Sequence, residues 1–100
     1  EPESFEHTSY EKFRERCLAT GLPALAAAMN EKLYREHGPT LTKDHFFIVL
    51  AEDSETGDLI CFEKMALNEP IRLTSLKNIF DRYPKSLWAV QKIGESSDDE

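Results

Sequence analysis

The sequence lacks most of the motifs by which enzymes are recognised. Its four glycines, at positions 21, 38, 57 and 94, are too far apart to form a Gly-rich phosphate loop. The Gly-x-Ser-x-Gly turn of α/β-hydrolases and the His-Glu-x-x-His motif of zinc proteases are both missing. No apolar run approaches the roughly 20 residues that a membrane span requires. We therefore expect a protein that is not an enzyme and has no membrane partner.

Cysteine and histidine are also scarce, with two and three residues respectively. Cys17 lies on the apolar stripe of a predicted helix and Cys61 in an apolar strand, so both are expected to be small buried hydrophobic residues. A sequence gives no distance between them and leaves a disulfide open. No His or Cys pair has the spacing of a zinc site, so neither a metal nor another cofactor is expected. A core without cross-links favours an intracellular protein, cytoplasmic or nuclear.

Basic charge is low, since 12 Lys and Arg residues stand against 19 Asp and Glu, for a net charge of −7. The acidic excess lies at the ends, because residues 1–6 hold three acids, residues 95–100 hold four, and neither segment holds a base. No basic stripe marks a nucleic-acid-binding surface, so nucleic acid is not an expected partner. We expect residues 1–7 and 95–100 to be disordered acidic segments and residues 8–94 to form a single α+β domain.

Helical spacing dominates the N-terminal part of the sequence. Thr8 and Glu11 have the spacing of a capping box, which predicts a helix from Thr8 to a stop at Gly21. A second helix is predicted to start at Pro23 and to end at residues 38–39. Its apolar stripe consists of Leu22, Leu25, Ala26, Met29 and Leu33. The short link between the two segments predicts an antiparallel helical hairpin.

Two apolar segments, residues 45–51 and 59–65, flank an acidic turn and predict a β-hairpin in which Gly57 supplies a positive φ. A helix beginning at Thr42 is the alternative for residues 45–51, because a short apolar run fits either structure. The acidic turn does not have the spacing of a calcium loop, since positions 5 and 12 counted from Asp53 are a glycine and a lysine.

Residues 74–83 have the spacing of a third helix, which Pro84 ends, and residues 87–93 predict a last strand. The predicted fold is therefore α+β, with an N-terminal helical hairpin, a β-hairpin, a third helix and a final strand. Its order is ααββαβ, and its sheet is a small antiparallel or mixed sheet of three strands.

The first strand of the predicted β-hairpin is apolar on both faces. Side chains alternate along a strand, which separates Phe46, Ile48 and Leu50 from Phe47, Val49 and Ala51. A half-exposed sheet would alternate apolar with polar residues, so both faces of this sheet require cover. The third helix either covers the second face or packs beside the helical hairpin on the first. The latter arrangement leaves an apolar face of about 300–600 Å² open.

These features favour a small non-enzymatic protein–protein interaction domain: an adaptor, an inhibitor or a subunit of a larger assembly. It would use an apolar sheet face or edge to bind a protein partner or a second copy of itself. The expected contact residues are Phe47, Val49, Tyr83 and Trp88. A small-molecule-binding domain or enzyme subunit, with its site at an oligomer interface, is the alternative. Nucleic-acid binding or mimicry ranks third.

Overall fold

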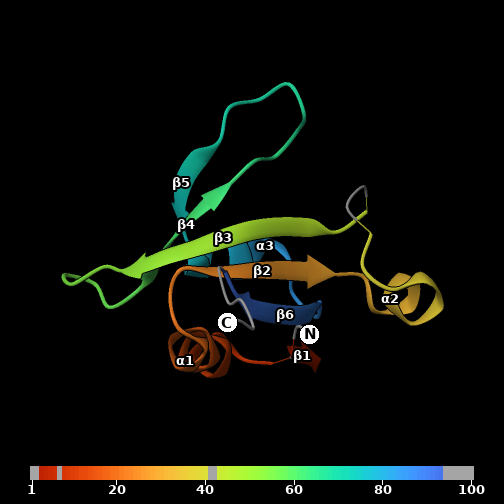
Figure 1. The fold of residues 1–100 in the computed structure, drawn as a ribbon, viewed down its shortest axis with the longest axis horizontal. Helices are drawn as coiled ribbons and strands as arrows, with labels where there is room; N and C mark the ends of the chain where they lie inside the picture. The colour runs from red at the N-terminus through yellow and green to blue at the C-terminus, as the bar shows by residue number, and fades with distance from the viewer. Residues whose placement is uncertain (1–2, 7, 41–42, 94–100) are drawn as a thin grey trace, which may run out of the picture.

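The computed structural model describes residues 3–6, 8–40 and 43–93, which form three helices and a six-stranded antiparallel sheet (Figure 1). In chain order the elements are β1 (Glu3–Glu6), α1 (Tyr10–Thr20), β2 (Ala24–Met29), α2 (Glu31–His37), β3 (His45–Glu52), β4 (Leu59–Glu63), β5 (Arg72–Ser75), α3 (Leu76–Arg82) and β6 (Leu87–Lys92). The strand order across the sheet is β1-β6-β2-β3-β4-β5. Strands β2 to β5 thus form a meander, and β6 lies between β2 and the short strand β1.

The predicted helical hairpin and three-stranded sheet are wrong. Residues 24–29, expected in the second helix, form β2 in the middle of the sheet, where it pairs with β3 on one side and β6 on the other. Helix α2 begins only at Glu31, after the Asn30 side chain caps it by accepting a hydrogen bond from the Leu33 amide. After β1, the order is therefore αβαβββαβ rather than ααββαβ.

The alanine-rich segment forms a strand because of its surroundings. Its alternate residues belong to two different clusters: Ala24, Ala26 and Ala28 to one, Ala27 and Met29 to the other. All of β2 except Leu25 is buried. A central strand that is covered on both faces is a continuous apolar run without alternation, which at this length resembles a buried helix in sequence. The helix propensity of alanine is too weak to outweigh two flanking strand pairings.

The other elements follow the predictions more closely. The β-hairpin is confirmed as β3 and β4, with a bulge between Val49 and Ala51, and the last strand is confirmed as β6. Helix α1 lies where expected, but Ser9 rather than Thr8 caps it. Residues 72–75 form β5, which the sequence analysis missed. Residues 3–6, within the segment expected to be disordered, pair with β6 as β1, whereas residues 95–100 lie outside the described residues.

Helices α1 and α3 pack on the same face of the sheet, where they contact each other. The strand order gives the reason. Helix α1 connects the parallel strands β1 and β2, and α3 connects the parallel strands β5 and β6. The two connections run in opposite directions across the sheet, between strand pairs that also point in opposite directions. Right-handed crossovers of this kind place both helices on one face.

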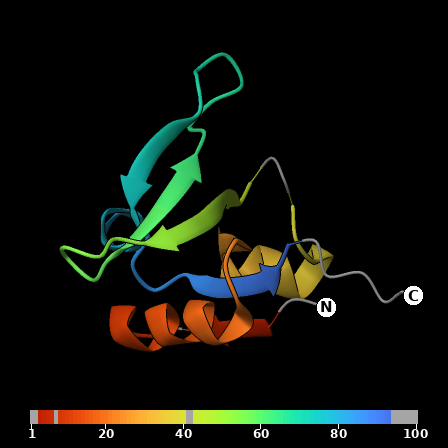
Figure 2. The ribbon, with the colours of Figure 1, turned by 60° about the vertical axis from the view of Figure 1, so that its left-hand side comes forward.

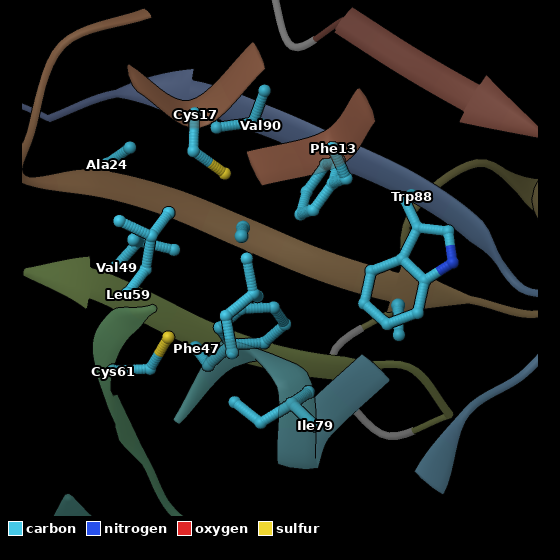
Figure 3. Close-up of a cluster of buried hydrophobic side chains, with 13 residues drawn as sticks. Phe13, Cys17, Ala24, Phe47, Val49, Leu59, Cys61, Ile79, Trp88 and Val90 are labelled. Carbon is cyan, nitrogen blue, oxygen red and sulfur yellow. The ribbon is translucent and has the colours of Figure 1, made fainter. Parts of the chain in front are cut away.

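The core between the sheet and these two helices is aromatic. Phe13 of α1, Phe47 of β3 and Trp88 of β6 converge there, with Ile79 of α3 beside them (Figure 3). Phe80 stacks on Trp88 with ring centroids 4.4 Å apart. The small alanines of β2 leave room for these rings, and this is the packing reason for an alanine-rich strand at the centre of the sheet.

Candidate functional site

Three of the four residues expected to contact a partner are buried in this core. Val49 and Trp88 are 0% exposed and Phe47 is 2% exposed. Tyr83, just after α3, packs against the same core, and its ring stacks on that of His45 at 5.0 Å. All four residues thus lie on the helix-covered face of the sheet, and the accessible apolar side chains lie elsewhere.

The opposite face of the sheet carries an apolar row. Leu25, Ile48, Phe62 and Leu73 lie directly opposite one another on β2, β3, β4 and β5. Residues paired in this way point to the same face of an antiparallel sheet. Leu25 and Phe62 are 38% exposed and Leu73 is 60% exposed. We call this surface the open face and include in it Leu25, Phe46, Ile48, Ile60, Phe62, Ile71 and Leu73.

Of the described helices, only α2 packs against this face. Tyr34 of α2 lies against a small cluster at one end of it, which contains Met29 and Leu87. The sequence left two positions open for the third helix. Helix α3 packs beside α1 on the covered face, so it does not cover the rest of the open face. No residue that β2, β3, β4 or β5 places on the open face is charged. The described residues therefore leave most of this face uncovered, and its strands place no charge on it, while Lys64, just after β4, lines the hollow over the outer strands.

Two hollows lie along the open face. The first, of about 260 Å³, lies beside α2 and is lined by Met29, Tyr34 and Pro39 together with Leu25 and Phe46. The second, of about 230 Å³, lies over the outer strands and shares Leu25 and Phe46 with the first. Because they share these two side chains, the hollows form one apolar groove from α2 towards the β5 edge, which we call the groove.

The β4–β5 hairpin projects beyond the body of the molecule, as Figures 1 and 2 show. Its tip, residues 64–70, carries Met65 at 42% exposure and Leu67 at 95%. Ile71, just after the tip, is 62% exposed. Of the eight large apolar side chains exposed in the described part of the chain, six lie on the open face or at this tip. The exposure is therefore concentrated rather than scattered, as expected of a contact surface.

On the covered face, a buried carboxylate fixes the hairpin to the body. The side chain of Glu63 is fully buried and is bonded to His45 Nε2 at 2.7 Å, Arg72 Nη2 at 3.1 Å and Arg82 Nη2 at 2.5 Å. Burial by itself raises the pKa of Glu63. The hydrogen bonds from Arg82 and His45 and the positive charge of Arg82 outweigh that effect and lower this pKa below its ordinary value.

This cluster ties elements together, and its carboxylate is fully engaged. Both carboxylate oxygens of Glu63 are occupied, and the His45 ring lies between Phe47 and Tyr83. A general base needs a lone pair within reach of a substrate proton, and Glu63 has no exposed surface. The partners come from β3, β5 and α3, which are distant in sequence, so no local spacing marks the cluster in the sequence.

The remaining polar candidates are also engaged within the chain. Asp44 does not pair with His45 but accepts hydrogen bonds from the amides of Asn30 and Thr40. Cys17 and Cys61 are buried free thiols. Within residues 3–6, 8–40 and 43–93, no group of three or more His, Cys, Asp or Glu residues could hold a metal ion. None of the described helices is long and apolar enough to cross a membrane.

Comparisons with protein-family models, with curated proteins and with solved structures found no match to this chain. The open face, the groove and the hairpin tip are therefore the features from which a function has to be inferred.

Proposed function

We propose that this chain is a non-enzymatic protein–protein interaction domain that receives an apolar surface of another protein chain in the groove of its open face. The observation that carries the proposal is the uncharged row of Leu25, Ile48, Phe62 and Leu73 in register across four strands. The fold of the single chain leaves Leu25, Phe62 and Leu73 of this row exposed, because α2 packs only at one end of the face.

The exposed area is enough to drive association of moderate strength. Burying a fully exposed Leu, Ile or Phe side chain contributes about 1.5–3 kcal/mol. Leu25, Phe62, Ile71 and Leu73, at 38%, 38%, 62% and 60% exposure, together expose the equivalent of about two such side chains. Covering them therefore contributes about 4 kcal/mol before the entropy of association is subtracted. The tip and the apolar surface that the partner buries in turn add to this gain, and together they are sufficient for dissociation constants in the micromolar range once the cost of association is subtracted.

A protein surface fits the groove better than a small molecule does. Pockets for drug-sized ligands usually have volumes of about 300–1,000 Å³ and enclose most of the ligand. The two hollows of the groove, at about 260 and 230 Å³, lie side by side over several strands and do not form one enclosed cavity. A long shallow groove of this kind suits an extended or helical apolar segment.

Buried free cysteines support an intracellular location for this binding domain. Cys17 and Cys61 are both buried and unpaired, in a small domain that would gain stability from a disulfide in an oxidising compartment. We therefore place its function in a reducing compartment.

Selection of peptides from a phage-displayed random library against the immobilised chain tests the proposal. We expect enriched peptides that contain several apolar or aromatic residues and bind with micromolar affinity by fluorescence polarisation. Replacing Phe62 or Leu73 by Lys should weaken that binding about tenfold or more, since it removes apolar contact and places a charge in the groove.

Leu18→Lys serves as the matched control, because Leu18 is also exposed, at 36%, but lies on α1. This variant should bind the peptides within about twofold of the unmodified chain. Circular dichroism verifies that each variant is folded. The proposal fails if no peptide is enriched, or if the enriched peptides bind the Phe62→Lys and Leu73→Lys variants as tightly as the unmodified chain.

A further inference from the structure

We propose that the partner segment is an extended strand that pairs antiparallel with the free edge of β5 and carries the pattern apolar–acidic–apolar. Its two apolar side chains lie on the open face beside Leu73 and Ile71, and its acidic side chain lies opposite Arg72 on the other side of the sheet. The inference rests on the proposed function and adds the conformation and the side-chain pattern of the partner.

The first observation is that β5 has a backbone edge with which no described strand pairs. β5 is the last strand of the sheet, and Figure 2 shows it on the outer side of β4. In an antiparallel sheet the amide and carbonyl groups of successive residues point alternately to the two sides of a strand. One side of β5 therefore bonds to β4, and the other side presents unpaired groups that an extended chain can bind.

A hydrogen bond in the β3–β4 turn shows which residue points outward. The amide of Asp53, just after β3, donates to the carbonyl of Asp58, just before β4, so this carbonyl points to β3. The bulge of this hairpin adds its extra residue to β3, so the alternation along β4 is unbroken. Glu63 lies an odd number of residues further on, so its groups point to β5, where it pairs with Arg72. The N–H and C=O of Leu73, the next residue, therefore point away from the sheet.

The side chains along this edge set the apolar part of the pattern. Leu73 lies on the open face at the outer end of the apolar row, and Ile71 lines the hollow over the outer strands. Leu73 is 60% exposed and Ile71 is 62% exposed. An added strand places every second side chain on this face. Apolar residues opposite Leu73 and Ile71 extend the row by one strand and cover both side chains.

The residue between these two apolar positions lies opposite Arg72, and charge determines its type. Arg72 contacts the Glu63 carboxylate at 3.1 Å, and Arg82 contacts the same carboxylate at 2.5 Å. One negative charge thus meets two guanidinium groups, and the cluster keeps a net positive charge. The Arg72 side chain is 54% exposed on the edge strand. Its position opposite the added strand is a non-hydrogen-bonded pair, in which side chains lie closest, so an Asp or Glu there matches the remaining charge.

Two other occupants lack these features. A helix bonds its own backbone groups internally and leaves those of Leu73 unpaired. A second copy of β5, with the sequence RLTS, has no acidic residue to place opposite Arg72. The edge therefore favours an extended segment of a different chain.

A synthetic peptide with the sequence Thr-Val-Thr-Val-Glu-Val-Thr-Val-Thr contains the pattern and tests the inference on the full chain. By fluorescence polarisation we expect saturable binding with a dissociation constant below about 100 µM. Gln in place of the Glu should weaken binding about threefold, and Lys about tenfold or more, because the charge opposite Arg72 is first removed and then reversed. All three peptides are compared on the unmodified chain, so the test does not depend on the folding of a variant.

Methylation of the peptide backbone tests strand pairing separately from the side chains. A methyl group on the amide nitrogen of either Val next to the Glu removes a hydrogen bond to β5 and should weaken binding about tenfold or more. Methylation of the Glu amide, which points away from β5, is the matched control and should change the dissociation constant by no more than about twofold. In the complex, the amide of Leu73 should exchange with deuterium about tenfold more slowly than in the free chain, as measured by NMR.

The outcomes separate the inference from the proposed function. The inference is overturned if the peptide does not bind, if the Glu and Lys peptides bind equally well, or if methylation of Val and of Glu has the same effect. An unchanged exchange rate of the Leu73 amide overturns it as well. If library-selected peptides still depend on Phe62 and Leu73, the interaction domain then stands and only strand pairing at β5 is removed. A chain that binds neither the selected peptides nor this one overturns both.

Discussion

Replacing Glu63 by Gln is the sharpest test of how the hairpin is held on the body. The change keeps the shape of the side chain and removes the one negative charge among His45, Arg72 and Arg82. A carboxylate only accepts hydrogen bonds, whereas the amide has an NH₂ group on one side. At least one of the three partners would then face a donor instead of an acceptor.

The expected loss of unfolding free energy depends on how completely the charged groups are buried. Removing one partner of a buried ion pair destabilises a protein by about 3–5 kcal/mol. Glu63 is fully buried, but the side chains of Arg72 and Arg82 are 54% and 27% exposed, so water can solvate part of the charge left behind. We therefore expect a loss near the lower limit, about 3 kcal/mol. In a domain of about 100 residues this corresponds to a fall in Tm of roughly 12–24 °C.

The same substitution predicts a change in pH dependence. The pKa of Glu63 is lower in the folded protein than its ordinary value near 4.3, so its ionised form stabilises the fold. That contribution is complete above the unfolded pKa and is lost as the pH falls through the folded pKa. The Gln variant has no such group to titrate. The difference in unfolding free energy between the two proteins should therefore shrink as the pH is lowered below about 4.

Urea unfolding followed by tryptophan fluorescence measures both effects, because Trp88 is the single tryptophan and is buried in the core. Glu36→Gln is the control, since the Glu36 side chain is 51% exposed and its surface ion pair contributes little. The reasoning is refuted if Glu63→Gln unfolds within about 0.5 kcal/mol of the unmodified protein at neutral pH. A difference in unfolding free energy between the two proteins that does not shrink on acidification would equally contradict the reasoning.

Two further predictions concern the core. Ala26→Leu should lower the unfolding free energy, measured in urea, by about 1–3 kcal/mol. Ala26 is 1% exposed in the central strand, and a larger side chain has no space there. An unchanged stability would contradict the packing explanation of β2. In the folded protein neither thiol should react with Ellman's reagent at pH 8, because burial raises the pKa of Cys17 to about 12 and also raises that of Cys61. Two equivalents should react in guanidinium chloride, and rapid reaction of the native protein would show that the thiols are accessible.

Several elements could be predicted from the sequence because local signals mark them. Helix α1 has an apolar stripe and stops at Gly21, and β3 and β4 are apolar runs on either side of a glycine-containing turn. Strand β5 could not be predicted in this way. It is four residues long and leads directly into α3, so pairing with β4 alone defines it as a strand.

The candidate site could be predicted only in part. The two-sided apolar pattern of residues 45–51 is present in the structure, with one set of side chains in the core under the helices and the other on the open face. That the open face requires cover stays a prediction. The four named contact residues lie on the covered face, because alternation separates Phe47 and Val49 from Phe46 and Ile48 without showing which pair lies under the helices. The cluster around Glu63 was missed altogether, since its partners come from three distant elements.

The sequence by itself determined the local elements that have a clear hydrophobic period or a stop signal. It also determined that residues 45–51 carry apolar side chains on both faces of a strand. Both depend on the order of side chains along a short stretch of backbone, which a sequence records directly. The tertiary structure decided that residues 24–29 form a central strand and that α1 and α3 share a face. These depend on strand pairing and on the handedness of two crossovers, which bring together segments far apart in the chain. The open face exists because both crossovers place their helices on the same side of the sheet.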